Sequence, residues 1–315
     1  MIIMIVIGCA GAAVLLAALT AIGTVMIERQ YPPEGRFVDV TGGRLHVLER
    51  GKPDAPVVVL LHGASSNLQD VNAALGAPLA ARYRVIMIDR PGHGWSDRPG
   101  SDDEASPARQ AALIAQVLEK IGVARAILVG VSWSGALATN YALTFPERVA
   151  GLVLLAPVSH PWPGGIAWHY RLTSMPVLGP LFVRTALMPL AYPMMDGLVR
   201  AAFAPQPMPD GYPERAALPL ALRPDEFLAN ARDVADLKAN VTLQAHRYGE
   251  IRVPAVIIAG GRDTTVLPDI HSKALAAAIP NAKLIIVPGV GHIIHHAKAE
   301  LVIGEIDTIA ARVAR

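Results

Sequence analysis

The chain has 315 residues, of which 52% are hydrophobic and 17% are charged, and its formal net charge is +2. So small a net charge gives no reason to expect a nucleic-acid partner, whereas the apolar excess indicates contact with lipid or with a lipophilic ligand. The single cysteine, Cys9, excludes internal disulfides and metal sites built from several cysteines.

The first 27 residues contain no charged side chain. At about 1.5 Å per residue, this run is long enough to cross a hydrocarbon core of about 30 Å as a helix. We expect residues 1–27 to be an uncleaved membrane anchor rather than a signal peptide, because no basic segment precedes the apolar run. Lipidation at Cys9 is a third interpretation, weakened by the little apolar sequence before it.

Basic residues after the apolar run bear on its orientation. By the positive-inside tendency, they favour a cytoplasmic location for the remainder of the chain, with a secreted or periplasmic location left open. They are Arg29, Arg36 and Arg44.

Several segments after the anchor have the pattern of β-strands or helices. A hairpin is predicted around the Gly-Gly turn at residues 42–43, and a helix is predicted where Ser106 can cap and Pro107 can open the first turn. The remaining strands are continuous apolar runs typical of buried parallel strands. In chain order the predicted elements are a hairpin (36–51), strands (56–63 and 83–94), a helix (106–123), strands (125–132, 148–159, 253–263 and 282–292) and a closing helix (299–315).

Strands that alternate with helices indicate a doubly wound, mostly parallel α/β sheet. Residues 160–250 interrupt this alternation and are rich in Pro, Met and aromatic residues. Because strands resume at Val253, we interpret this stretch as an insertion into one core. The predicted core therefore comprises residues 28–159 and 251–315.

Candidate catalytic groups follow the carboxyl ends of four predicted strands, the edge at which open α/β sheets place their sites. They are the segment His62-Gly63-Ala64, then Ser132, Asp263 and His292. A serine hydroxyl needs a base to become a useful nucleophile, and histidine suits that task near neutral pH. A carboxylate on the other ring nitrogen would orient the histidine, and backbone N–H groups would stabilise the oxyanion.

The segments "LLHGASSN", "DRPGHGWSDRP", "LVGVSWSGALA", "IIAGGRDTTV" and "VPGVGH" make the chain resemble the α/β-hydrolase superfamily from about residue 36 to the end. The resemblance implies Ser132 as nucleophile, Asp263 as acid and His292 as base, with the backbone N–H groups of Ala64 and Trp133 as oxyanion donors. It also implies that the insertion is a helical cap. The serine turn departs from the strict G-x-S-x-G pattern, because Ser134 stands where a glycine is usual.

Other residues of the chain have competing interpretations. His295 and His296 are expected to be solvated or to line the pocket, and a metal at these histidines is disfavoured because no carboxylate or cysteine is close in sequence. Candidate substrate-binding residues are Trp133, Trp162 and Met175. No cofactor motif is present, so neither a metal nor a cofactor is expected.

The nucleophile limits the predicted reaction. Relatives of this superfamily that open epoxides or remove halides use an aspartate, so a serine implies acyl-enzyme chemistry on an ester-like substrate. We expect a carboxylic-ester hydrolase for a hydrophobic small molecule. A cofactor-free acyltransferase or perhydrolase, a C–C bond hydrolase and a non-catalytic ligand-binding protein remain as alternatives, and the oligomeric state stays open.

Overall fold

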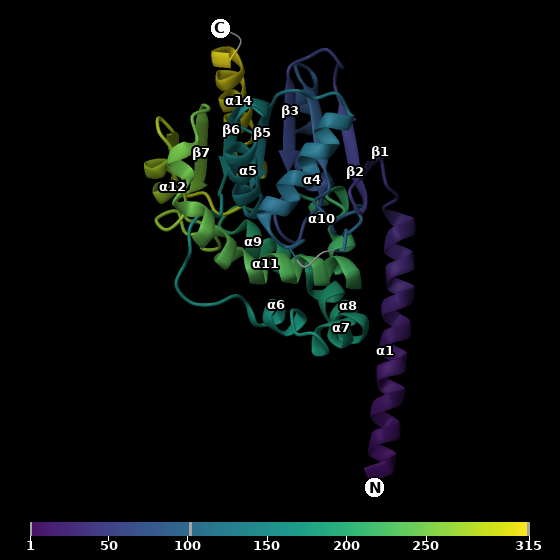
Figure 1. The fold of residues 1–315 in the computed structure, drawn as a ribbon. Coiled ribbons are helices and arrows are strands. Elements are labelled where there is room, and N and C mark those ends of the chain that lie inside the picture. Colours follow the sequence, from purple (N-terminus) through teal and green to yellow (C-terminus); the bar gives the residue numbers. More distant parts are fainter. Residues whose placement is uncertain (1, 101–102, 314–315) are drawn as a thin grey trace.

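The computed structural model describes residues 2–100 and 103–313 and shows helices on both faces of a central sheet (Figure 1). The eight strands lie in the order β1-β2-β4-β3-β5-β6-β7-β8. The first two pairings, β1 with β2 and β2 with β4, are antiparallel, and the other five are parallel. The strands are β1 (Arg36–Val40), β2 (Gly43–Arg50), β3 (Val57–Leu61), β4 (Arg84–Ile88), β5 (Ala126–Val131), β6 (Val149–Leu155), β7 (Ala255–Gly260) and β8 (Lys283–Val287).

The predicted doubly wound sheet is thereby confirmed, and each predicted strand has a counterpart. Alternate residues of the central strands enter two separate buried cores: Val59 and Leu61 of β3 belong to one, and Val58 and Leu60 to the other. Each core is closed by helices, because strand side chains alternate between the two faces of a sheet. The helices of the core domain are α2 (Leu68–Val71), α3 (Ala77–Ala80), α4 (Pro107–Lys120), α5 (Trp133–Thr144), α12 (Ser272–Ala278), α13 (Ile294–Ala297) and α14 (Ala299–Val313).

The start of α4 follows from its sequence. The Ser106 hydroxyl accepts a hydrogen bond from the backbone N–H of Arg109, and Pro107 occupies the first turn, where no N–H is needed. Both predicted features are confirmed.

Residues 160–250, which we call the cap, are inserted between β6 and β7 and are helical. The helices lie beside the loops that follow the parallel strands (Figure 1). The α-helices of the cap are α6 (Trp168–Thr173), α7 (Leu178–Phe182), α8 (Met188–Ala191), α9 (Met195–Phe203), α10 (Tyr212–Arg215) and α11 (Pro224–Ala245).

The N-terminal helix α1 (Ile2–Gln30) is mostly exposed and extends beyond the rest of the molecule (Figure 1). Its residues 10–30 are long and apolar enough to cross a membrane, with a mean hydropathy of 2.2. The C-terminal part of α1 touches the cap, where Thr20 donates a hydrogen bond to the carbonyl of Thr185 (3.2 Å). The lipidation alternative concerns the Cys9 side chain, which lies outside the described part of the structure.

Candidate active site

Ser132 lies on a sharp turn between β5 and α5, with φ 52° and ψ −113°. Such a backbone conformation is strained for serine and persists only when its surroundings hold it. Here the Ser132 N–H donates to the carbonyl of Leu155 (2.8 Å), and the Ser132 carbonyl accepts from Val158 (3.0 Å). The turn also needs Gly130, because a Cβ at that position would lie 2.5 Å from the carbonyl oxygen of Ser134.

Ser134 is more than a small residue in place of glycine. It is fully buried, and its hydroxyl donates to the backbone carbonyl of His62 in the loop after β3. Gly135 instead permits the close approach of α5 to the loop after β6, because a side chain at this position would collide with Pro157. The departure from the usual motif therefore adds a hydrogen bond between the serine turn and the neighbouring loop.

The structure brings Ser132, His292 and Asp263 together from three separate loops. His292 Nε2 lies 3.0 Å from Ser132 Oγ, and His292 Nδ1 lies 2.7 Å from Asp263 Oδ2. The second carboxylate oxygen of Asp263 accepts from the backbone N–H groups of Thr265 (2.8 Å) and Val266 (2.9 Å). The carboxylate is buried and bonded on both oxygens, so it holds the His292 ring in a fixed orientation towards Ser132.

The loop that carries Ala64 lies directly against the serine. A Cβ at the preceding residue, Gly63, would be 3.4 Å from Ser132 Cβ. The next residue, Ser65, has a positive φ of 52° and is held by a cap side chain: Asn230 Oδ1 accepts from the Ser65 N–H (2.7 Å), and Asn230 Nδ2 donates to Ser65 Oγ (2.9 Å). Asn230 thus positions the predicted oxyanion loop, a role that the sequence did not reveal.

A buried ion cluster supports the other predicted oxyanion donor, Trp133. Asp233 of α11 accepts from Arg90 (2.7 Å) and from Arg98 (2.8 Å), and the Arg90 guanidinium lies 4.0 Å from the centre of the Trp133 ring. The indole N–H of Trp133 donates to the Asp233 backbone carbonyl (3.0 Å). Trp133 is 1% exposed, and its ring packs against the ion cluster beneath the turn. This position does not support the prediction that the Trp133 side chain contacts substrate.

Comparison with known proteins decides the family. Residues 56–299 match the model of a family described as the alpha/beta hydrolase fold. The chain belongs to this family.

The hydrolase is similar to proteins of several activities. It is 28% identical, over 79% of its length and 85% of the relative, to a 2-hydroxy-6-oxononadienedioate/2-hydroxy-6-oxononatrienedioate hydrolase of Comamonas testosteroni. Two solved structures share its fold. An enol-lactonase of Burkholderia xenovorans is 20% identical with a TM-score of 0.68, over 88% of this chain and all of the lactonase chain. An esterase of a Rhodococcus species is 24% identical with a TM-score of 0.67, over 87% of this chain and 97% of the esterase chain.

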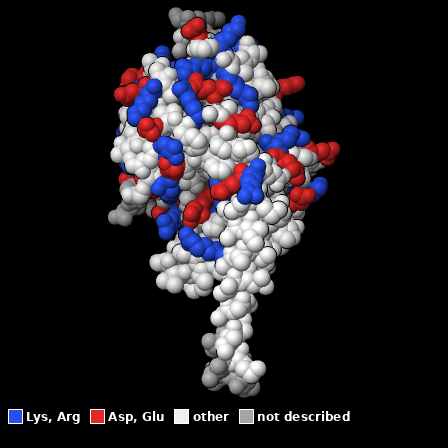
Figure 2. Space-filling view, turned by 90° about the vertical axis from the view of Figure 1, so that its right-hand side faces the viewer, with Lys and Arg blue, Asp and Glu red and all other residues white. Residues whose placement is uncertain are grey.

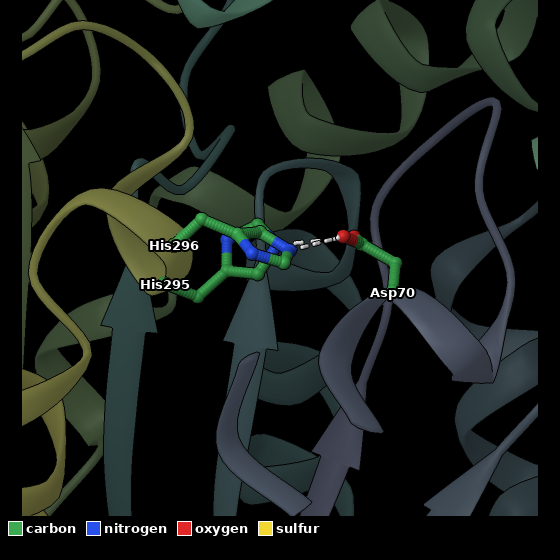
Figure 3. A group of neighbouring side chains, drawn as sticks. All are labelled: Asp70, His295 and His296. Atoms are coloured by element: carbon green, nitrogen blue, oxygen red, sulfur yellow. Dashed lines mark hydrogen bonds and ion pairs between the residues drawn. The ribbon is translucent and has the colours of Figure 1, made fainter. Parts of the chain in front are cut away.

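Two further histidines of the hydrolase meet a carboxylate that is distant in sequence. His295 Nε2 lies 3.0 Å from Asp70 Oδ2, and His296 Nε2 lies 2.8 Å from Asp70 Oδ1 (Figure 3). Tyr212 of the cap donates to Oδ1 (2.8 Å), and the Ser66 hydroxyl donates to Oδ2 (3.1 Å). We call these five residues the Asp70 cluster. The expectation that the two histidines are solvated is wrong, because Asp70 holds both in a buried polar cluster.

Asp70, His295 and His296 are also a group of described side chains that could hold a metal ion, since their ligand atoms lie within 4.8 Å of one another. Metal binding through both Nε2 atoms would move each ring proton to Nδ1. His295 Nδ1 is buried and has no hydrogen-bond partner among the residues that the structure describes, whereas a ligating histidine normally donates that N–H to an acceptor. The cluster therefore fits a set of hydrogen bonds around one carboxylate better than a metal site.

The charge states of the Asp70 cluster follow from its surroundings. Burial opposes ionisation, but His295 and then His296 hold the pKa of Asp70 well below its usual range. Burial also lowers the pKa of His295, although Asp70 opposes this shift. An ionised Asp70 that accepts a hydrogen bond from a neutral His295 ring satisfies both tendencies.

His93 and the two other candidate substrate-binding residues, Trp162 and Met175, lie in different parts of the structure. His93 is fully buried and within hydrogen-bonding distance of the Arg90 guanidinium (2.9 Å), and burial holds the pKa of His93 well below its usual range, which fits a structural role in the loop. Trp162 packs partly against the core, and its ring lies 5.9 Å from that of His271. Met175, a candidate substrate-binding residue, is 45% exposed on the cap surface.

Proposed function

We propose that the protein is a serine hydrolase that forms an acyl-enzyme at Ser132. The observation that carries the proposal is the continuous chain of short contacts from Ser132 Oγ through His292 to Asp263. The strained turn at Ser132 supports it, because such strain occurs where a nucleophile must be presented.

In the proposed first half-reaction, Ser132 Oγ attacks the substrate carbonyl while His292 Nε2 accepts the hydroxyl proton. The negative charge that develops on the carbonyl oxygen is stabilised by the backbone N–H groups of Ala64 and Trp133. Asp263 stabilises the imidazolium. His292 then returns the proton to the departing oxygen, which leaves the acyl group on Ser132.

In the second half-reaction, water replaces the departed group. His292 Nε2 accepts a proton from the water as its oxygen attacks the acyl carbon, and the same two N–H groups stabilise the second tetrahedral intermediate. Collapse of this intermediate breaks the bond to Ser132 Oγ, which takes the proton back from His292. The products are a carboxylic acid and the regenerated serine.

A carboxylic ester with a hydrophobic group is the proposed substrate class. The apolar excess of the sequence supports it, as does the predicted route through an acyl-enzyme. Cleavage of a C–C bond next to a ketone is a second candidate, favoured by the similarity to the 2-hydroxy-6-oxononadienedioate/2-hydroxy-6-oxononatrienedioate hydrolase. An acyltransferase or perhydrolase would use the same residues and would differ in the acceptor of the acyl group.

We further propose that α1 anchors the enzyme in a membrane. The helix has apolar side chains on all sides and is largely uncovered by the rest of the molecule, as expected for a helix that contacts lipid. The basic residues that follow it favour the cytoplasmic side. A signal sequence would have the same length and composition, and retention of α1 in the mature protein distinguishes the two.

A fluorophosphonate probe tests the proposed activity directly, because labelling requires the nucleophile, the base and the oxyanion donors together. The wild-type protein is expected to be labelled and to hydrolyse short p-nitrophenyl esters, whereas Ser132→Ala should do neither while it keeps its circular-dichroism spectrum. Unlabelled wild-type protein would indicate a non-catalytic binding protein. Product analysis with esters, with a vinylogous diketone and with added alcohol or peroxide separates the hydrolytic reactions from acyl transfer.

A further inference from the structure

The outer surface of the cap is unusually apolar. Between residues 172 and 199 the only charged side chains are Arg184 and Asp196, and Arg184 is paired with Asp225 (2.9 Å). Large apolar side chains in and just before this stretch are exposed, with Val177 76% exposed and Leu181 56% exposed. We call this set the apolar cap face: Trp168, Met175, Val177, Leu178, Leu181, Leu190, Tyr192, Met194 and Leu198.

Figure 2 shows that the part of the molecule formed by the lower cap and α1 is almost free of charged residues in this view, whereas charged residues cover the core above it. Soluble monomers rarely expose an apolar surface of this extent, so such a face marks a site that contacts something else. The question is therefore what covers the apolar cap face.

The position of α1 indicates the answer. Thr20 bonds to Thr185, Gly23 packs so closely on the cap that a side chain there would collide with Met188, and Ile27 enters an apolar cluster with Met188. Residues 2–19 precede these contacts in the helix, and the N-terminal end of α1 extends beyond the cap (Figure 1). At about 1.5 Å per residue they measure about 27 Å, slightly less than a hydrocarbon core of about 30 Å.

The whole apolar run of 27 residues would measure about 40 Å, or about 10 Å more than the hydrocarbon core. If α1 spans the bilayer, its last apolar turns must lie at the membrane boundary, and these turns contact the cap. The first charged residue of the chain, Glu28, pairs with Arg223 (3.2 Å) just beyond them. The length of α1 therefore places the part of the cap that contacts it at the depth where apolar side chains of peripheral proteins enter a bilayer, about 5–10 Å below its surface. Leu181 and Leu190 of the apolar cap face flank these contact residues in the chain.

We propose that the apolar cap face inserts into the lipid bilayer beside α1, so that the cap is a membrane-embedded surface. A lipid surface is favoured over a second copy of the chain because the face is continuous with a helix that is itself long enough to span the membrane. The proposal rests on the proposed anchor, and the experiment below reads the two separately.

The test places one fluorophore at each of three exposed leucines of the full-length protein. Cys9→Ser removes the only thiol, and Leu181→Cys, Leu15→Cys and Leu243→Cys each introduce one for labelling with an environment-sensitive NBD dye. Leu243 is the matched control, because it is a leucine that is 72% exposed on α11 but does not belong to the apolar cap face. Circular dichroism checks that every labelled variant remains folded.

The labelled proteins are reconstituted into phosphatidylcholine vesicles with a nitroxide near the headgroup end of the acyl chains. We expect the nitroxide to quench the Leu181 dye several-fold more than the Leu243 dye, and aqueous iodide to quench them in the opposite order. Iodide access at Leu181 equal to that at Leu243 would overturn the proposal. Protection from iodide without nitroxide quenching would also overturn it, since a second copy would then cover the face. The Leu15 dye reports the anchor alone.

Discussion

Asp70→Asn tests whether the Asp70 carboxylate joins the cap to the catalytic loops. The carboxylate accepts four hydrogen bonds, two on each oxygen. An asparagine has one acceptor oxygen, so two donors would face an N–H₂ group instead of an oxygen. A hydrogen bond to a charged group contributes about 1.5–3 kcal/mol, so loss of two should lower the free energy of unfolding by about 3–6 kcal/mol.

Denaturant titration in detergent, followed by tryptophan fluorescence, measures this free energy. Tyr212→Phe is the graded control, because it removes one donor, keeps the ring and should cost about 1.5–3 kcal/mol. A shift of the His295 ring proton to Nδ1 should not rescue the asparagine variant, since within the described part of the chain Nδ1 has no acceptor for that proton. The reasoning would be refuted if Asp70→Asn were no less stable than Tyr212→Phe.

His292→Ala should lower ester hydrolysis by roughly a thousandfold or more, whereas His295→Ala should keep most of the activity and lose stability; kcat/KM and thermal melts of both variants check this. Ser134→Gly should keep the serine turn active but lose about 1 kcal/mol with its hydrogen bond, and Ser134→Ala should behave alike, so a large fall in kcat with either would contradict a role limited to packing and that bond. Burial raises the pKa of Glu226 to about 7, although Arg223 opposes the shift. Above the usual pKa of a glutamate, the folded protein therefore still holds a proton on Glu226 that the unfolded chain has released. This proton stabilises the folded state by at most about 3 kcal/mol, and that stability is lost as the pH rises through neutrality. Glu226→Gln should flatten this pH dependence of the melting temperature.

The sheet and the positions of Ser132, Asp263 and His292 could be predicted because each depends on a local pattern. A continuous apolar run followed by a turn residue marks a buried strand and its carboxyl end, and parallel strands bring those ends to one edge. The departure at Ser134 could also be seen. Its hydrogen bond to the carbonyl of His62 could not, because that partner is 72 positions away in the chain.

The polar groups that support the site have no comparable local signal. Asp70 and His296 are 226 positions apart, and nothing near either residue indicates the other. For α11 a signal did exist: Asn230 and Asp233 share one buried helical face with Leu237 and Val241. Polar residues on an apolar helical face must find buried partners, so this spacing could have predicted that α11 contacts polar groups of the core.

The cap carries different kinds of side chain on its inner and outer surfaces. Towards the core, cap side chains make buried polar contacts: Tyr212 with Asp70, Asn230 with Ser65, and Asp233 with Arg90. Towards the outside, the apolar cap face carries leucine, methionine and aromatic side chains. The cap also buries apolar residues such as Leu187, Leu237 and Val241, so its unusual feature is the apolar outer surface. This combination follows if the inner surface must hold the loops around Ser132 in place while the outer surface lies in lipid.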